Sequence, residues 1–172
     1  MSRYFVFDVE SIGLHGEAFA VGWVVVDAAG GELSSGRAEC WRDNAKGRLP
    51  DRAWVDQHIP VGNINCSTPA EVRAAFWSAW KTERAKGAVM VADCCWPVEA
   101  RFLIACVDVD PEERRWLGPY PLHDVATARL SAGLDPLGTE ERLPNELPKH
   151  CPLADARQSA RLFLEALTVH HG

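Results

Sequence analysis

Two carboxylates lie close together near the start of the sequence. Asp8 and Glu10 occur in FDVESIGLHG, residues 7–16, directly behind an apolar run. Side chains on an extended chain alternate with a period of two, so both carboxylates would point to one face of a strand. Like charges at this separation raise each other's pKa unless a cation or a shared proton balances them. The pair predicts a cation-binding edge or, as the alternative, the wet face of an edge strand.

Acidic and histidine side chains also stand at the ends of later core segments. Asp93 and Glu99 follow a short apolar run, residues 88–92, and His150 precedes Asp155 by five residues at the start of an apolar-periodic segment. Five residues exceed one helical turn, so with Asp155 on the helix His150 would lie in the loop before it. The two side chains can then converge on one cleft.

Carboxylates that converge with one histidine suit metal-assisted hydrolysis of a phosphodiester. Two divalent ions about 4 Å apart can activate a water, clamp the phosphate and stabilise the leaving oxygen. Carboxylate oxygens are hard ligands that favour Mg²⁺ or Mn²⁺. A histidine can take a proton from the attacking water near neutral pH. The pattern therefore predicts a two-metal phosphodiesterase site.

Strand-like segments open the chain and would carry the first pair of carboxylates. Residues 4–10 predict one strand, and a second strand from residue 18 turns at Asp27–Gly31 and enters a third over residues 34–41. Three antiparallel strands followed by helices favour an α/β sheet domain.

The rest of the chain predicts helices around further strands. The clearest helix lies within residues 67–87, with Thr68 as its N-cap and Pro69 in its first turn. Trp77 and Trp80 on this helix are expected to pack in the core or on its flank. The other expected elements are a buried strand at 88–93, a helix from Pro97 to Val107, a strand at 121–127 and a final helix from near Pro152.

Composition and charge limit the class of protein. The 172 residues, 47% hydrophobic and 24% charged, predict a single soluble domain over residues 1–172. No apolar run approaches the roughly 20 residues of a membrane span, and we expect a cytoplasmic protein without a signal peptide. Six cysteines without CxxC spacing predict reduced thiols. The net charge of −6 argues against a long electrostatic track for nucleic acid, although metal ions can still hold a few phosphates.

Motifs in this order resemble the DEDDh 3'-to-5' exonucleases of the ribonuclease H-like fold, which include oligoribonuclease, RNase T and polymerase proofreading domains. FDVESIGL is similar to the first motif of that family, Asp-x-Glu followed by Thr-Thr-Gly-Leu or a near variant. HCPLADA is similar to its third motif, a histidine followed five residues later by aspartate and then alanine. LHDVATARL lies at the position where the family has a strand that leads into a sequence similar to Asp-x-x-x-Leu-Ala-Arg.

The resemblance implies a fold and a set of roles. The fold would be a ribonuclease H-like mixed sheet, three antiparallel strands and then parallel strands, flanked by helices. Asp8, Glu10 and Asp155 would bind two Mg²⁺ or Mn²⁺ ions, and His150 would be the general base. Leu14 would match the apolar residue that wedges against the terminal base.

Three further residues are expected to contact substrate. The resemblance places Ser11 and Ile12 against the 3'-terminal sugar. Trp96 lies beside the expected site in the sequence, and its ring is suited to stack on a base.

The middle of the chain departs from the second motif of the family, Asn-x-x-x-Asp-x-x-Phe-Leu. In DCCWPVEARFL, Glu99 stands three residues before Phe102, in the place of the ligand aspartate, whereas Asp93 falls nearer the asparagine position. Register favours Glu99, and Asp93 is the alternative from the strand tip. The departure also leaves open a catalytically weak member of the family.

We therefore expect a metal-dependent 3'-to-5' exonuclease that acts on 3' ends of short single-stranded RNA or DNA. RNA is favoured by family analogy alone. The alternatives are an inactive nucleic-acid-binding module of the same fold and a phosphohydrolase of small nucleotides. The resemblance also allows a homodimer.

Overall fold

A five-stranded mixed sheet forms the centre of the protein, as seen in a computed structural model that describes residues 2–170. The sheet order is β3-β2-β1-β4-β5. β1 pairs antiparallel with β2, and β2 with β3, whereas β4 runs parallel to β1 and β5 runs parallel to β4. The expected mixed sheet, three antiparallel strands and then parallel strands, is confirmed. The strands are β1 (Arg3–Ser11), β2 (Ala18–Asp27), β3 (Glu32–Glu39), β4 (Ala88–Ala92) and β5 (His123–Asp124).

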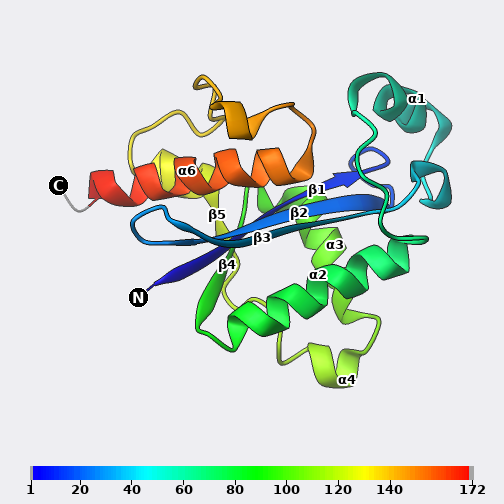
Figure 1. Ribbon diagram of the computed structural model, residues 1–172, viewed down its shortest axis with the longest axis horizontal. Coiled ribbons are helices and arrows are strands. Elements are labelled where there is room, and N and C mark those ends of the chain that lie inside the picture. The colour runs from blue at the N-terminus through cyan, green and yellow to red at the C-terminus, as the bar shows by residue number, and fades with distance from the viewer. Residues whose placement is uncertain (1, 171–172) are drawn as a thin grey trace.

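Helices cover both faces of the sheet (Figure 1). The long helices α2 and α6 lie on opposite faces, and α1 lies beyond the end of the sheet near the end of β1 (Figure 1). No helix among residues 2–170 is long and apolar enough to cross a membrane. The helices are α1 (Leu49–His58), α2 (Pro69–Arg84), α3 (Ala100–Val107), α4 (Pro111–Arg114), α5 (Val125–Ser131) and α6 (Pro152–His170).

The alternation of β1 divides the core into two clusters. Phe5 and Phe7 pack with the residues of α2 and α3, whereas Val6 packs with those of α5 and α6. Because side chains alternate along a strand, Asp8 and Glu10 continue the face of Val6. The sequence thus directs both carboxylates to the side of the sheet that α6 covers.

The N-terminus of α2 follows the local sequence signals. The Thr68 hydroxyl accepts a hydrogen bond of 3.3 Å from the backbone N–H of Glu71, as an N-cap does. Trp77 and Trp80 are 2% and 3% exposed, so both pack in the core and not on its flank.

Two expected elements are wrong in part. The strand expected at 121–127 ends at Asp124, because the Asp124 carboxylate accepts a 2.7 Å hydrogen bond from Thr127 N–H and caps α5. The helix expected from Pro97 becomes regular only at Ala100, because Trp96 has an extended backbone within an irregular helical turn, Cys95–Glu99.

Candidate active site

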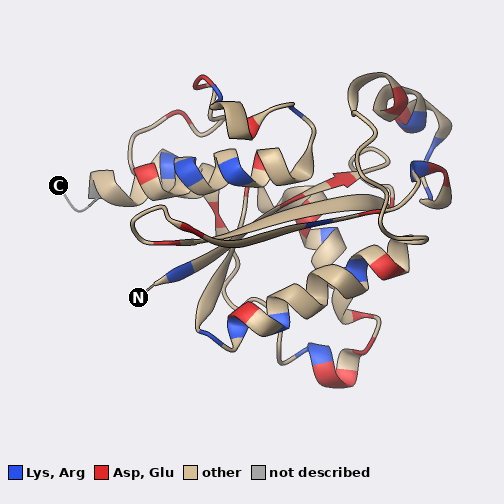
Figure 2. Cartoon of the chain, viewed as in Figure 1, with Lys and Arg blue, Asp and Glu red and all other residues tan. Residues whose placement is uncertain are grey.

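Carboxylates from four parts of the chain converge where β1 ends. Asp8 and Glu10 come from β1, Asp93 follows β4, Glu99 precedes α3, and Asp155 lies in the first turn of α6. Figure 2 shows the acidic end of β1. Burial and the negative charges of the four other carboxylates raise the pKa of Asp8 well above its usual range. All five side chains therefore share one electrostatic environment.

A glycine on the neighbouring strand lets α6 approach this point. Gly22 of β2 is paired with Asp8 across the sheet. A Cβ on Gly22 would lie 2.2 Å from the backbone nitrogen of Leu153, which is far inside van der Waals contact. The absent side chain therefore permits the first turn of α6, which carries Asp155, to lie directly on the sheet.

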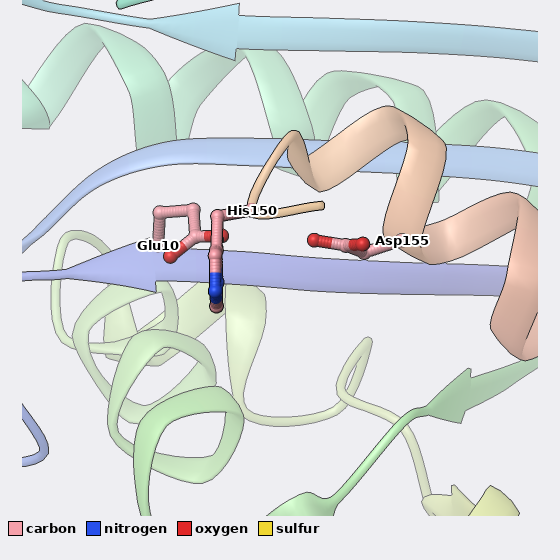
Figure 3. A group of neighbouring side chains, drawn as sticks. All are labelled: Glu10, His150 and Asp155. Carbon is pink, nitrogen blue, oxygen red and sulfur yellow. The ribbon is translucent and has the colours of Figure 1, made fainter. Parts of the chain in front are cut away.

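Glu10, His150 and Asp155 form the tightest group in the site. One ligand atom of each lies within 4.8 Å of the others, and His150 Nδ1 is 3.9 Å from Glu10 Oε1. Figure 3 shows the three side chains converging from β1, from the loop before α6 and from α6 itself. The spacing suits donor atoms around one cation.

The loop before α6 holds His150 in an unusual backbone conformation. Its φ is +59°, in the left-handed region that non-glycine residues adopt at a cost. The ring meets Trp54 of α1 edge to face, with centroids 5.8 Å apart, and its side chain is 45% exposed. His150 therefore sits at the mouth of the site with one side open to solvent.

Arg142 is the basic residue in direct contact with the cluster. Its guanidinium forms an ion pair with Asp155 and donates a 3.0 Å hydrogen bond to the backbone oxygen of Glu146. Burial still raises the pKa of Asp155, although the hydrogen bond and charge of Arg142 and the charge of His150 lower it. No local motif marks Arg142, because its contact with Asp155 crosses a loop.

Two buried glutamates of the cluster bind protons tightly. Burial, with the charges of Asp155 and Glu99, raises the pKa of Glu10 to about 8, although Arg37 and Arg42 lower it. Burial also raises the pKa of Glu99 to about 7. Without a cation, the site therefore holds one or more protons near neutral pH.

Glu99 and Asp93, the two alternatives for the middle carboxylate, differ in their surroundings. Glu99 is 6% exposed, and hydrogen bonding to the backbone of Val9, between Asp8 and Glu10, lowers its pKa against the larger effect of burial. The carboxylate of Asp93 instead accepts a 3.0 Å hydrogen bond from the Ser159 hydroxyl of α6. Glu99 thus joins the inner end of the cluster, and Asp93 is held at its α6 side.

A cavity of about 300 Å³ adjoins the cluster. Glu10, Ser11 and Leu14 line it from β1 and the following turn, and Trp54 lines it from α1. Leu14 is 63% exposed, as a residue that meets a ligand can be. Trp54 was not identified from the sequence, because neither a helix at 49–58 nor its contact with His150 has a strong local signal.

Two of the residues expected to contact substrate, Ile12 and Trp96, do not line this cavity. The side chain of Ile12 is fully buried in the core, so only its backbone can face a ligand. Trp96 is 72% exposed but does not line the cavity.

Comparisons with solved structures find exonucleases. A zinc-bound complex of E. coli exonuclease I with single-stranded DNA aligns over 98% of this chain with a TM-score of 0.64 and 12% identity. A second exonuclease I structure aligns over 95% with a TM-score of 0.60 and 14% identity. A 3'-exonuclease that recognises the 3' end of a histone mRNA stem-loop aligns over 97%, with a TM-score of 0.53 and 11% identity, and over 81% of its own chain.

The chain has the ribonuclease H-like fold of these exonucleases. The resemblance indicated by the sequence motifs is confirmed at the level of the fold. The alignment spans 41% and 40% of the two exonuclease I chains, or about two fifths of their length. No family model matches the sequence, and no curated protein matches it.

Proposed function

We propose that this protein is a metal-dependent 3'-to-5' exonuclease that acts on short single-stranded nucleic acid, with RNA favoured over DNA. The observation that carries the proposal is the group of carboxylates beside His150, most of which form no ion pair with lysine or arginine within residues 2–170. Such a group is costly to bury unless a ligand brings positive charge to it. The fold that this chain shares with exonucleases supports a divalent metal ion as that ligand.

The donor set fits Mg²⁺ or Mn²⁺. Asp8, Glu10, Asp155 and Glu99 would hold two ions through carboxylate oxygens, with Asp93 as the alternative to Glu99. When bound, the ions would supply charge stabilisation at the scissile phosphate and acidify the attacking water. The carboxylate oxygens of Glu10 and Asp155 lie within 4.8 Å of each other, which supports at least one cation position.

His150 would act as the general base. Its ring lies at the open edge of the cluster, where it can take the proton of an attacking water and pass it to solvent. Trp54 packs edge to face against the ring and limits its movement. The ring is thereby kept beside Glu10 for each turnover.

The 300 Å³ cavity would receive the 3'-terminal nucleotide. Leu14 and the Trp54 ring would contact the base, and Ser11 with the backbone of Ile12 would lie near the sugar. Trp96, fully outside this space, would contact a base only farther along the strand. The small volume supports a single nucleotide at the reactive end rather than a duplex.

The direct test uses 5'-labelled single-stranded RNA and DNA oligomers with Mn²⁺, Mg²⁺ or EDTA. We expect a metal-dependent ladder that shortens from the 3' end, lost in Asp8→Asn and retained in the control Asp43→Asn, whose side chain is 84% exposed and outside the site. A ladder that survives EDTA or Asp8→Asn would contradict the mechanism. Intact oligomers that nevertheless bind would favour the inactive binding module.

A phosphohydrolase of small nucleotides is the second candidate. The net charge of −6 and the one-nucleotide cavity favour it over an enzyme that holds long strands. Phosphate or nucleotide release from mononucleotide derivatives, with no cleavage of oligomers under the same conditions, would select this function.

A further inference from the structure

A larger cavity lies on the other side of the turn that follows β1. Its volume is about 650 Å³, well within the range of about 300–1,000 Å³ seen for ligand pockets. Residues 13–14 of the turn line the smaller cavity, and residues 15–17 line the larger one, so the turn forms a wall between them. The two cavities nevertheless adjoin through three shared residues, Ser11, Asp51 and Val98.

One wall of this larger cavity is apolar. Val98, Phe102 and Ala105 line it from α3 and the turn before it, and they lie one helical turn or so apart along that element. Such a surface can contact the face of a base or the carbon atoms of a sugar.

The other walls carry basic side chains. Four basic residues and three carboxylates line the cavity. Two ion pairs balance part of the positive charge: Arg73 pairs with Glu17 at 3.0 Å, and Arg48 pairs with Asp51 at 3.9 Å. Within residues 2–170, Lys46 and Arg101 make no ion pair, and Asp108 is the third carboxylate. Figure 2 shows basic residues on the segment that leads into α1 and on α2.

Arg73 also keeps a spare hydrogen-bond donor. Its guanidinium binds Glu17 through one terminal nitrogen, while its Nε has no hydrogen-bond partner in the described part of the chain. A buried donor without a partner is unfavourable, and the guanidinium fork matches the geometry of a phosphate as it does that of a carboxylate.

We propose that the larger cavity binds the nucleotide adjacent to the terminal one, with its phosphate on Lys46 and Arg101 and its base against α3. This proposal rests on the proposed function. The local excess of unpaired basic residues contrasts with the net charge of −6 of the chain, so phosphate is attracted here although the protein as a whole repels it. The shared residues at the boundary allow one strand to pass from one cavity into the other.

The test measures binding separately from cleavage. The affinities of uridine 5'-monophosphate and of a tetra-uridine oligomer are measured by calorimetry in Ca²⁺, with the oligomer checked as intact on a gel. The variant Lys46→Gln/Arg101→Gln is compared with wild type and with Lys81→Gln/Arg115→Gln. The control variant also removes two surface cations, and neither of its residues lines either of these two cavities.

The expected result is a loss that depends on chain length. The cavity variant should bind the tetranucleotide about ten-fold more weakly and the mononucleotide less than about two-fold more weakly. The slope of log affinity against log salt for the tetranucleotide should fall by about 0.7, because the two removed cations neutralise one phosphate between them. The control variant should change neither affinity by more than about two-fold.

Two outcomes would overturn the proposal. Equal losses for both ligands would assign the cavity to a free nucleotide instead of a continuing strand, and a tetranucleotide affinity no weaker than that of the control would leave the cavity without phosphate. Because binding is measured without turnover, a length-dependent loss would stand even if the protein cleaved nothing, and so the two proposals fail separately.

Discussion

Two groups of buried carboxylates in this protein differ in their partners. Glu39, Glu83 and Glu146 are 1%, 5% and 1% exposed, and each forms an ion pair with an arginine. Glu10 and Glu99 are similarly buried, at 9% and 6%, but make no ion pair with lysine or arginine in the described chain. The fold thus neutralises its buried acids where they are structural and leaves them unpaired at the end of β1.

The pKa values of Glu146 and Glu10 shift in opposite directions because only Glu146 has an arginine partner. Burial alone would raise the pKa of Glu146, but hydrogen bonds from Arg161 and from the backbone of Leu143 outweigh it and lower the pKa. At Glu10, burial and neighbouring negative charges act together and raise the pKa to about 8. The cluster therefore lacks the positive charge that arginines supply to the other buried glutamates, and a bound cation would supply it.

The largest expected effect separates functional members of the cluster from a bystander. Glu99→Gln should lower exonuclease activity by about 10³-fold, because it removes a charge from the buried end of the group, whereas Asp93→Asn should lower it by less than about ten-fold. Single-turnover cleavage rates in saturating Mn²⁺ measure both. The reverse order would make Asp93 the middle carboxylate.

Stability should change in opposite directions in the two groups. Glu146→Gln should lower the free energy of unfolding by about 3 kcal/mol, because Arg161 loses its buried partner. Glu10→Gln should raise it in EDTA, by about 1 kcal/mol or more, because an unpaired charge or a tightly held proton is no longer required. Urea denaturation at pH 8 compares them, and destabilisation by Glu10→Gln would remove the distinction between the groups.

The pH dependence of the metal-free protein should reveal the unpaired group. A carboxyl group whose pKa is raised on folding binds its proton more tightly in the folded state, so its contribution is complete below about pH 4.5 and is lost as pH rises through about 8 for Glu10. Stability in EDTA should therefore fall between pH 5 and pH 8, by up to about 1.4 kcal/mol per pH unit for each proton that the folded cluster retains.

The matched control is Glu10→Gln, in which this fall should be smaller. Excess Mn²⁺ should reverse the trend in wild type, because protons compete with the metal for the same oxygens. Thermal melts across this pH range measure all three, and a flat wild-type profile in EDTA would contradict the prediction.

The smallest expected effect concerns the basic residue in the cluster. Arg142→Gln should tighten Mn²⁺ binding by about five-fold, or about 1 kcal/mol, because the guanidinium no longer occupies Asp155 or repels the ion. Arg157 of α6 pairs with Glu32 and not with Asp155, so Arg157→Gln serves as the control. Calorimetric titration measures the affinity, and weaker binding in Arg142→Gln would mean that Arg142 positions Asp155 for the metal.

Local patterns in the sequence predict the elements that carry the site. The period of two places Asp8 and Glu10 on one face, and the cap at Thr68 and the stripe after Pro152 locate α2 and α6. The expected strand through residue 127 is wrong beyond Asp124, because Val125 and the residues after it belong to α5. The spacing of Asp124 and Thr127 carried the capping signal that ends β5.

Contacts between distant segments could not be predicted in this way. The approach of Arg142 to Asp155 and of Trp54 to His150 depends on how a loop and α1 pack, which no spacing in the sequence specifies. The basic cavity also draws residues from four separate segments, so its charge emerges only after folding.

The left-handed backbone at His150 has a chemical consequence. A glycine at this position would relieve the cost of φ +59° and leave an imidazole-sized gap between Trp54 and Glu10. A His150→Gly protein should therefore fold at least as well as wild type, and imidazole added to the buffer could enter the gap and restore turnover. The variant thus separates the catalytic role of the imidazole ring from the conformational cost of a non-glycine residue at this backbone position.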